Sequence, residues 1–162
     1  MATPRDSYTF LNHDTLPPIP RDTLTTILRH WDNTTDASNT YLQYFAPDAV
    51  LSFGGEHRGR DGIRACHDSM IHPKTGPIVK CQHFFEKAYV PGSGDGGEES
   101  GKWEIIGVAD VRYTLVNGKE VTTRAASFAT LAKGEEGRWI AQRYEVFMDG
   151  SELMKEIGLL GR

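Results

Sequence analysis

The chain has 162 residues, of which 38% are hydrophobic and 25% are charged. This length and composition are typical of one globular domain with a single core, and they exclude a disordered or fibrous chain. The formal net charge is −4, from 18 basic and 22 acidic residues without a basic run, so we expect no nucleic-acid partner. The N-terminus lacks the apolar core of a signal peptide and no segment reaches membrane-spanning length. These features predict a soluble cytoplasmic protein with no membrane partner.

The N-terminal part divides into an arm and the start of a helical region. Residues 1–20 are rich in proline and have no sustained periodicity. This predicts an extended arm packed on the surface or against a partner subunit, or a disordered arm, followed by one domain over 21–162. Next comes an apolar stripe at the i, i+3, i+4, i+7 spacing of an amphipathic helix that begins near Asp22. The stripe consists of Leu24, Ile27, Leu28 and Trp31.

Further short elements are predicted between residues 36 and 72. A second short helix is expected over 41–45, with Asp36 as its N-cap. A short strand over 49–53 and a Gly-Gly turn come next, before a third helix over 59–72. The inward face of this third helix is expected to hold Ile63, Cys66, His67 and Met70.

The chain changes character after residue 77. Segments 78–90, 103–116, 121–132 and 138–148 are strand-like, and the last three are joined by Asn117-Gly118 and by GEEG, both typical of hairpins. The Gly-rich, acidic segment 91–102 predicts a mobile loop. Helices followed by an antiparallel meander indicate an α+β fold in which the helices cover one face of a curved sheet.

Two segments resemble a known family. YFAPDAVLSFGGEHRGRDGIRACH is similar to the strand-turn-helix block of the SnoaL-like polyketide cyclases, within the nuclear transport factor 2-like superfamily, and GRWIAQRYEVFMDGSEL resembles that family's last strand. The resemblance covers roughly residues 22–158. It implies a cone-shaped fold with one pocket, and a homodimer through the outer sheet face. The superfamily includes dehydratases, cyclases, isomerases, epoxide hydrolases and non-catalytic binding domains, so the resemblance leaves the activity open.

A narrower likeness is to scytalone dehydratase, a fungal enzyme of this fold. Trp31-x-x-x-x-Asp36 and the tripeptide QHF at 82–84 stand in the same order as their counterparts. The match places Asp36 on that enzyme's pocket aspartate and His83 on a pocket histidine. Leu115 falls where the enzyme has a second histidine, and Thr35 replaces a tyrosine. The resemblance therefore implies related chemistry on a different substrate.

His83 is the first candidate catalytic residue, because an imidazole on the concave face of a strand can exchange a proton near neutral pH. Asp36 is expected to orient that imidazole, as a carboxylate does when it fixes a histidine tautomer. The alternatives are that His83 is a core histidine and that Asp36 is only a helix N-cap.

Two residues of the strand 103–116 are further catalytic candidates. Asp110 resembles in position the acid of limonene epoxide hydrolase, although Val108 stands where that enzyme's motif has an arginine. Strict alternation turns Asp110 and Arg112 outward, and a bulge would turn them into the pocket. Tyr113 lies on the inward face and could donate a hydrogen bond to a substrate oxygen, or serve as a packing residue.

The candidate substrate contacts are Trp31, Tyr44, His67, Arg124 and Glu145. His67 is expected to point inward, as a second acid/base or as a packed core histidine. Arg124 and Glu145 fit either the pocket floor or a cross-strand pair on the outer face.

No metal or cofactor is predicted. The remaining histidines are scattered, Cys66 and Cys81 lack CxxC spacing and are expected to be reduced, and no phosphate-binding glycine motif or GxSxG is present. The leading hypothesis is a cofactor-independent lyase, isomerase or cyclase acting by acid-base catalysis on a small, largely apolar polyketide- or terpenoid-like intermediate. The alternatives are an epoxide hydrolase that uses Asp110 or Glu145, and a non-catalytic binding or dimerisation module.

Overall fold

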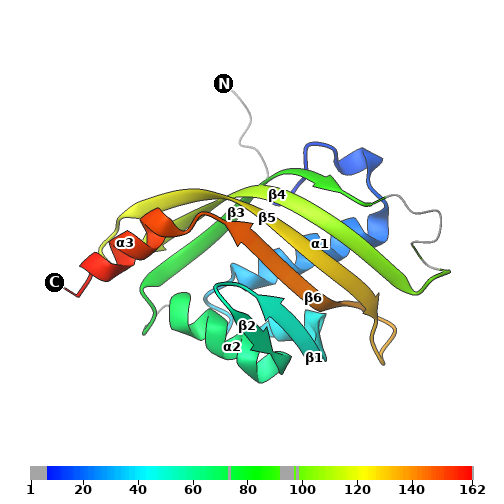
Figure 1. Cartoon of the computed structure of the whole chain (residues 1–162), viewed down its shortest axis with the longest axis horizontal. Coiled ribbons are helices and arrows are strands. Elements are labelled where there is room, and N and C mark those ends of the chain that lie inside the picture. Colours follow the sequence, from blue (N-terminus) through cyan, green and yellow to red (C-terminus); the bar gives the residue numbers. More distant parts are fainter. Residues whose placement is uncertain (1–6, 73, 92–96, 98, 162) are drawn as a thin grey trace.

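Figure 1 shows the computed structural model of the chain, in which α1 and α2 lie beneath the concave face of one curved sheet. The structure describes residues 7–72, 74–91, 97 and 99–161. Its helices are α1 (Pro18–Trp31), α2 (Gly59–Met70) and α3 (Ser151–Leu159), with 3-10 helices η1 (His13–Thr15) and η2 (Thr40–Tyr44). Its strands are β1 (Phe45–Ser52), β2 (Glu56–Arg58), β3 (Ile78–Tyr89), β4 (Lys102–Leu115), β5 (Glu120–Lys133) and β6 (Trp139–Met148).

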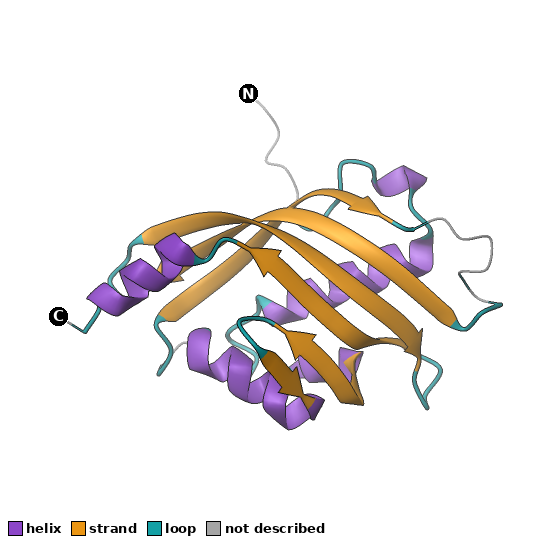
Figure 2. Cartoon of the chain, in the orientation of Figure 1, coloured by secondary structure: helices purple, strands orange, loops and turns teal. Residues whose placement is uncertain are grey.

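The six strands form one sheet in the order β2-β1-β6-β5-β4-β3, and the arrangement confirms the predicted α+β class (Figure 2). The sheet is mixed, because β1 pairs in parallel with β6 while the other neighbouring strands pair antiparallel. The parallel pair follows from the connections. Three successive antiparallel pairs make β6 run opposite to β3. β1 also runs opposite to β3, so β1 and β6 run in the same direction. The turn at Asn117-Gly118 forms as predicted, with Gly118 at a φ of 82°, which favours glycine.

Element boundaries differ from the sequence-based ones at both ends of the chain. α1 begins at Pro18 because proline is compatible with the first helical turn, so residues 18–20 belong to the helix and not to the arm. α3 was not predicted; its start is stabilised by Asp149, whose carboxylate accepts a hydrogen bond from the Ser151 N–H at 3.0 Å. Residues 1–6 of the predicted arm, and residues 92–96 and 98 of the predicted loop, lie outside the described residues.

β3 carries two register shifts against β4, one between Ile78 and Lys80 and one between Phe85 and Lys87. Ile78 is buried, and strict alternation from it would turn the even-numbered residues inward. The first shift reverses this parity, so that Cys81, His83 and Phe85 are buried instead. The irregularity thus places the His83 ring on the concave face.

The interior consists of two apolar clusters that meet beneath the middle of the sheet. The larger one packs the buried face of α1 and the start of β1 against the sheet, with Leu24 and Ile27 almost fully enclosed. The smaller one joins the ends of β3, β4 and β5 to Leu153 of α3. Residues from both clusters line one cavity. The candidate site is therefore built into the junction of the two halves of the core.

Candidate active site

Asp32 and His83 form a buried acid-imidazole pair. Asp32 follows the last residue of α1, and its backbone N–H donates to the Leu28 carbonyl at 3.0 Å. His83 Nδ1 lies 2.9 Å from Asp32 Oδ1 and 3.0 Å from Oδ2, and the His83 backbone N–H donates to Oδ2 at 2.8 Å. The exposed fractions of the two side chains are 3% for Asp32 and 10% for His83. The carboxylate thus holds both the backbone and the ring of His83.

This contact assigns the tautomer of the His83 ring. A carboxylate only accepts hydrogen bonds, so Nδ1 carries a proton and donates it to Asp32. In the neutral ring Nε2 then keeps a free lone pair, and it has no hydrogen-bond partner among the residues that the structure describes. His83 also lines the cavity. The arrangement can accept a proton at Nε2 while Asp32 stabilises the imidazolium that forms.

Two further donors converge on the Asp32 carboxylate. The Tyr8 hydroxyl donates to Oδ2 at 2.8 Å. The Cys81 thiol lies beside the same carboxylate, and burial together with the Asp32 charge raises the pKa of Cys81 well above its ordinary value. Cys81 therefore keeps its proton and donates to the carboxylate. This set of donors compensates for the loss of water around a buried charge.

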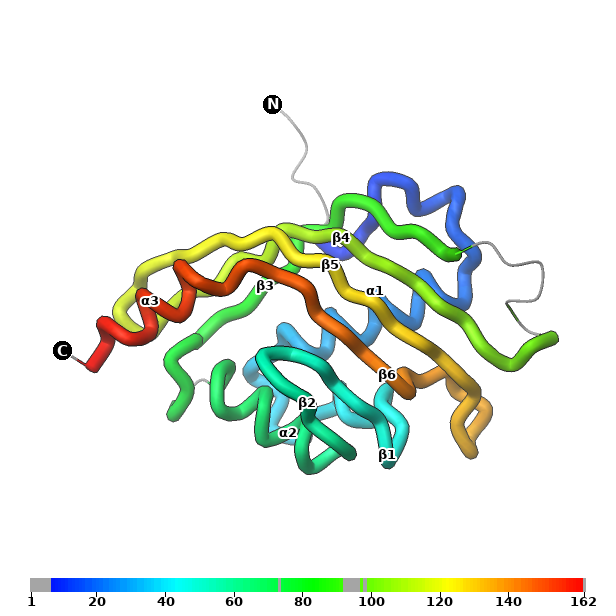
Figure 3. The backbone as a smooth tube through the Cα atoms, in the orientation of Figure 1, coloured from blue at the N-terminus to red at the C-terminus, as the bar shows by residue number. Residues whose placement is uncertain are grey.

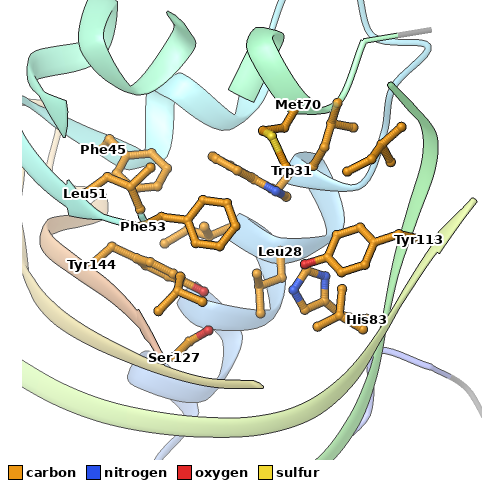
Figure 4. Close-up of a pocket in the computed structure, with 15 residues that line it drawn as sticks. Leu28, Trp31, Phe45, Leu51, Phe53, Met70, His83, Tyr113, Ser127 and Tyr144 are labelled. Carbon is orange, nitrogen blue, oxygen red and sulfur yellow. The ribbon is translucent and has the colours of Figure 1, made fainter. Parts of the chain in front are cut away.

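The cavity beside His83 is mostly apolar (Figure 4). Its enclosed space measures about 40 Å³, enough for a few water molecules. The apolar lining is Ile27, Leu28, Trp31, Phe45, Leu51, Phe53, Met70, Ile71, Ile78, Val111 and Val146. The polar lining consists of His83 and three hydroxyl residues, Tyr113, Ser127 and Tyr144. A ligand of this cavity therefore meets one imidazole and a few hydroxyl donors in an otherwise apolar setting.

The two tyrosine hydroxyls are available to a ligand. Tyr113 donates only to the thioether of Met148, a weak acceptor, at 3.6 Å. The Tyr144 hydroxyl lies near Ser127 but forms no hydrogen bond with any of the described residues. Burial raises the pKa of both phenols above the ordinary value, so both stay protonated and can donate to a substrate oxygen.

One wall of the cavity is thin. Phe53, Met70 and Val146 line both the cavity and a second, outer groove, which continues to Leu153 and Met154 of α3. A substrate larger than a few atoms therefore requires side chains of the lining to move, and these three separate the cavity from the outer groove.

The prediction that Asp36 orients His83 was wrong, because Asp32 occupies that place. The Asp36 carboxylate accepts hydrogen bonds from the Ser38 N–H at 3.0 Å and from the Thr40 N–H at 2.9 Å. These bonds, and one from the Ser38 hydroxyl, hold the pKa of Asp36 well below its usual range. Asp36 therefore stabilises the start of η2, the capping role that was its alternative.

The catalytic candidate Asp110 lies on the outer face of the sheet, as strict alternation indicated. Its side chain is 51% exposed and pairs with Arg124, whose guanidinium also contacts Glu86 at 2.6 Å. Glu145 pairs with Arg143 at 2.9 Å, not with Arg124. Because β4, β5 and β6 turn these side chains away from the cavity, the assignments of Asp110, Arg124 and Glu145 to the pocket were wrong.

The three aromatic candidates have different positions. Trp31 lines the cavity, and its role as a substrate contact stays a prediction. His67 is buried but lies behind Trp31, with Nε2 2.9 Å from the Trp31 carbonyl oxygen, so it supports the cavity wall as a packed core histidine. Tyr44 stacks on His30 and lies beneath Arg138, outside the cavity, so its assignment as a substrate contact was wrong.

Sequence reasoning missed Asp32, Ser127, Tyr144 and Tyr8. A signal for Asp32 was present, since it lies at i+8 from Leu24 and i+4 from Leu28, on the apolar stripe of α1. An acid on a buried stripe is a candidate functional residue. Ser127 likewise interrupts a run of buried apolar residues on the inward face of β5.

Asp32, Cys81 and His83 are also the group of described residues that could together hold a metal ion, with ligand atoms within 4.8 Å of one another. Binding would require the loss of both the Cys81 thiol proton and the His83 Nδ1 proton. The raised pKa of Cys81 opposes the first of these losses. The donor set therefore fits a hydrogen-bond network better than a cation site.

Comparison with known proteins connects this geometry to one fold. No protein-family model matches the sequence, and no curated protein matches it. Solved structures match well. A candidate scytalone dehydratase from Novosphingobium aromaticivorans superposes with a TM-score of 0.65 at 14% identity, over 81% of this chain and 82% of the other. Nuclear transport factor 2 of Cryptosporidium parvum gives a TM-score of 0.61 at 12% identity, over 87% of this chain and 98% of the other.

The chain therefore has the nuclear transport factor 2-like fold, which confirms the resemblance at this level. Within that fold it is similar to the scytalone dehydratase-like structure and to a hexachlorocyclohexane dehydrochlorinase, LinA type 2. The latter superposes with a TM-score of 0.65 at 14% identity, over 81% of this chain and 83% of that one. The SnoaL-like branch stays a prediction. No helix in the described part of the chain is both long and apolar enough to cross a membrane.

Proposed function

We propose that the chain is a cofactor-independent lyase that eliminates water or another small leaving group from a small, largely apolar molecule. The observation that carries the proposal is the 2.9 Å contact between His83 Nδ1 and the buried Asp32 carboxylate, in a ring that also lines an apolar cavity. Support comes from the shared fold with structures named as a dehydratase and a dehydrochlorinase, both elimination activities by name.

The reaction follows from the placement of the donors. His83 Nε2 removes a proton from a carbon next to a carbonyl, and Asp32 stabilises the imidazolium. Tyr113 or Tyr144 donates a hydrogen bond to the oxygen on which negative charge develops. The β-carbon then loses its leaving group, and the imidazolium can protonate a departing hydroxide to give water. A polyketide- or terpenoid-like intermediate with these groups fits the apolar lining, and isomerisation or cyclisation by the same base stays open.

The two alternatives receive less support. Hydrolysis of an epoxide was assigned to Asp110 or Glu145 as base, and both lie on the outer face of the sheet. A non-catalytic binding module was expected to lack a convergent polar pair in its pocket, whereas His83 and Asp32 converge at 2.9 Å.

The test is an assay of small apolar β-hydroxy and β-halo carbonyl compounds, with mass spectrometry for loss of water or hydrogen halide. We expect turnover by the wild type and a decrease of roughly 10²- to 10⁴-fold in kcat/KM in His83→Gln. The control is His30→Gln, because His30 stacks on Tyr44 outside the cavity. Unchanged turnover by a folded His83→Gln variant would refute the assignment. Incorporation of ¹⁸O from labelled water into the product would instead indicate hydrolysis.

A further inference from the structure

Tyr8 contacts the candidate site from outside the predicted domain. Its hydroxyl donates to Asp32 Oδ2 at 2.8 Å, the same oxygen that accepts the His83 N–H. Tyr8 belongs to the segment that precedes α1. The sequence predicted this segment to be an arm on the surface or against a partner subunit, or to be disordered. The segment thus reaches a buried carboxylate that holds the candidate base.

The backbone on both sides of Tyr8 is bound along β3 (Figure 3). The Phe85 N–H donates to the Ser7 carbonyl at 2.8 Å, and the Leu11 N–H donates to the Glu86 carbonyl at 2.6 Å. The Asn12 side chain both donates to and accepts from the Ala88 backbone, at 2.8 and 3.1 Å. These bonds place the segment at the free edge of β3, where unpaired backbone groups would otherwise face solvent.

Side-chain packing fixes the Tyr8 ring within this segment. Phe10 stacks on Phe85 with ring centroids 4.3 Å apart, and the Tyr8 ring meets the edge of Phe85 at 5.6 Å. The Arg29 guanidinium lies 5.2 Å from the Tyr8 ring centroid. A cation over the ring makes the phenol a stronger hydrogen-bond donor. The hydroxyl is therefore aimed at Asp32 by contacts from both β3 and α1.

The charge of the buried Asp32 carboxylate has to be stabilised by hydrogen-bond donors of the protein. It stands at the C-terminal end of α1, where the helix dipole is negative, and its side chain is only 3% exposed. Its remaining donors, the His83 N–H groups and the Cys81 thiol, all come from β3. The phenol of Tyr8 adds a donor from a separate segment and takes up part of the negative charge that would otherwise face the imidazole.

We propose that Tyr8 is a positioning residue of the candidate site, which acts through Asp32 on the orientation and tautomer of His83. The inference rests on the proposed function for its catalytic meaning, but the hydrogen-bond relay from Tyr8 through Asp32 to His83 can be tested without it. The N-terminal segment then belongs to the active site and is not an appendage of the domain.

The relay predicts a change in the tautomer of the His83 ring. The charged or polar groups around the ring are Asp32 from the end of α1, Cys81 from β3, Tyr113 from β4, Tyr144 from β6, and Tyr8 with Arg29 behind it. Tyr8→Phe removes one oxygen and leaves the Asp32 carboxylate with donors from β3 alone. The carboxylate is then held less firmly against Nδ1, and the Nδ1–H tautomer of the neutral ring should be less populated.

The experiment is ¹⁵N NMR of the labelled full chain at about pH 9, where a free imidazole is neutral, with the His83 ring signals assigned through His83→Gln. The matched control is Ser7→Ala, which removes the neighbouring hydroxyl and its 3.4 Å contact with Gln82 but no contact to Asp32. We expect the wild-type tautomer ratio in Ser7→Ala and a smaller Nδ1–H fraction in Tyr8→Phe. Equal tautomer ratios in the two folded variants would overturn the relay.

The result of the NMR test does not depend on whether the proposed lyase activity is found. If turnover is found, kcat/KM of Tyr8→Phe should fall together with the Nδ1–H fraction measured by NMR. A purely structural role of Tyr8 would lower the stability of the variant without changing the tautomer ratio, and would contradict the inference. If no compound is turned over, the proposed function fails while the NMR result still decides the relay.

Discussion

Replacement of Asp32 by asparagine separates the charge of this side chain from its shape. The carboxylate accepts from the Tyr8 hydroxyl at 2.8 Å, from the His83 N–H at 2.8 Å and from His83 Nδ1–H at 2.9 Å. An amide of the same shape has one acceptor oxygen. If that oxygen keeps Tyr8 and the His83 N–H, the amide NH₂ faces Nδ1 and donates to it. The ring must then carry its proton on Nε2 and loses its function as a base.

The expected losses follow from these contacts. Activity should fall by up to about 10⁴-fold, as expected when a catalytic imidazole is held in the wrong tautomer. The hydrogen bond to Nδ1 is reversed and all the bonds to this side chain lose their charge assistance, which costs a few kcal/mol. The removal of a buried charge from the negative end of α1 offsets part of this. We therefore expect Asp32→Asn to lower the free energy of unfolding by about 1 to 3 kcal/mol.

The assays are ¹⁵N NMR of the His83 ring for the tautomer and urea unfolding for stability. Asp36→Asn is the matched control, because Asp36 stabilises the start of η2 and does not contact His83. It should leave the tautomer unchanged and cost about 0.5 to 1.5 kcal/mol, since the amide keeps only one of the two accepting oxygens. An Asp32→Asn variant that keeps the Nδ1–H tautomer and full activity would refute this reasoning.

Three further predictions concern acid stability, assembly and metals. Burial lowers the pKa of His67, so the unfolded chain takes up a proton below about pH 6.5 that the folded chain does not. The resulting stability is present above that pH and decreases below it by at most about 1.4 kcal/mol per pH unit, and urea unfolding of His67→Gln should show a shallower decrease. The predicted homodimer should dissociate in Phe147→Glu, since Phe147 is 62% exposed on the outer sheet face, and light scattering that shows a wild-type monomer would contradict it. EDTA should leave turnover unchanged, whereas a loss restored by a divalent ion would implicate Asp32, Cys81 and His83 as ligands.

Much of the fold could be predicted because its signals are local. The stripe from Leu24 to Trp31 forms one helix face, and Asn117-Gly118 makes its hairpin turn. The parallel pairing of β1 with β6 could not be read in the same way, because it depends on how many hairpins separate two distant segments. The short β2 and the C-terminal α3 also lacked strong patterns.

The candidate site was predictable only in part. His83 was identified through a resemblance, since alternation from Ile78 would have turned it outward and only the register shift in β3 turns it inward. Asp36 was assigned by positional matching, and Asp32 was not considered, although it continues the apolar stripe of α1. Tyr8 could not be found from the sequence, because its contact with Asp32 spans 24 residues and depends on the edge of β3.

The position of Asp32 itself argues for function over stability. A carboxylate at the C-terminal end of a helix meets the negative end of the dipole, and its burial removes the water that would solvate it. Asp36 lies neither at the end of α1 nor in a buried position, and its hydrogen bonds stabilise a turn. A fold under selection for stability alone would favour an apolar or basic residue at the end of the α1 stripe. An acid at this position, enclosed by donors from the N-terminal segment and β3, is the pattern expected where a protein trades some stability for the control of one imidazole.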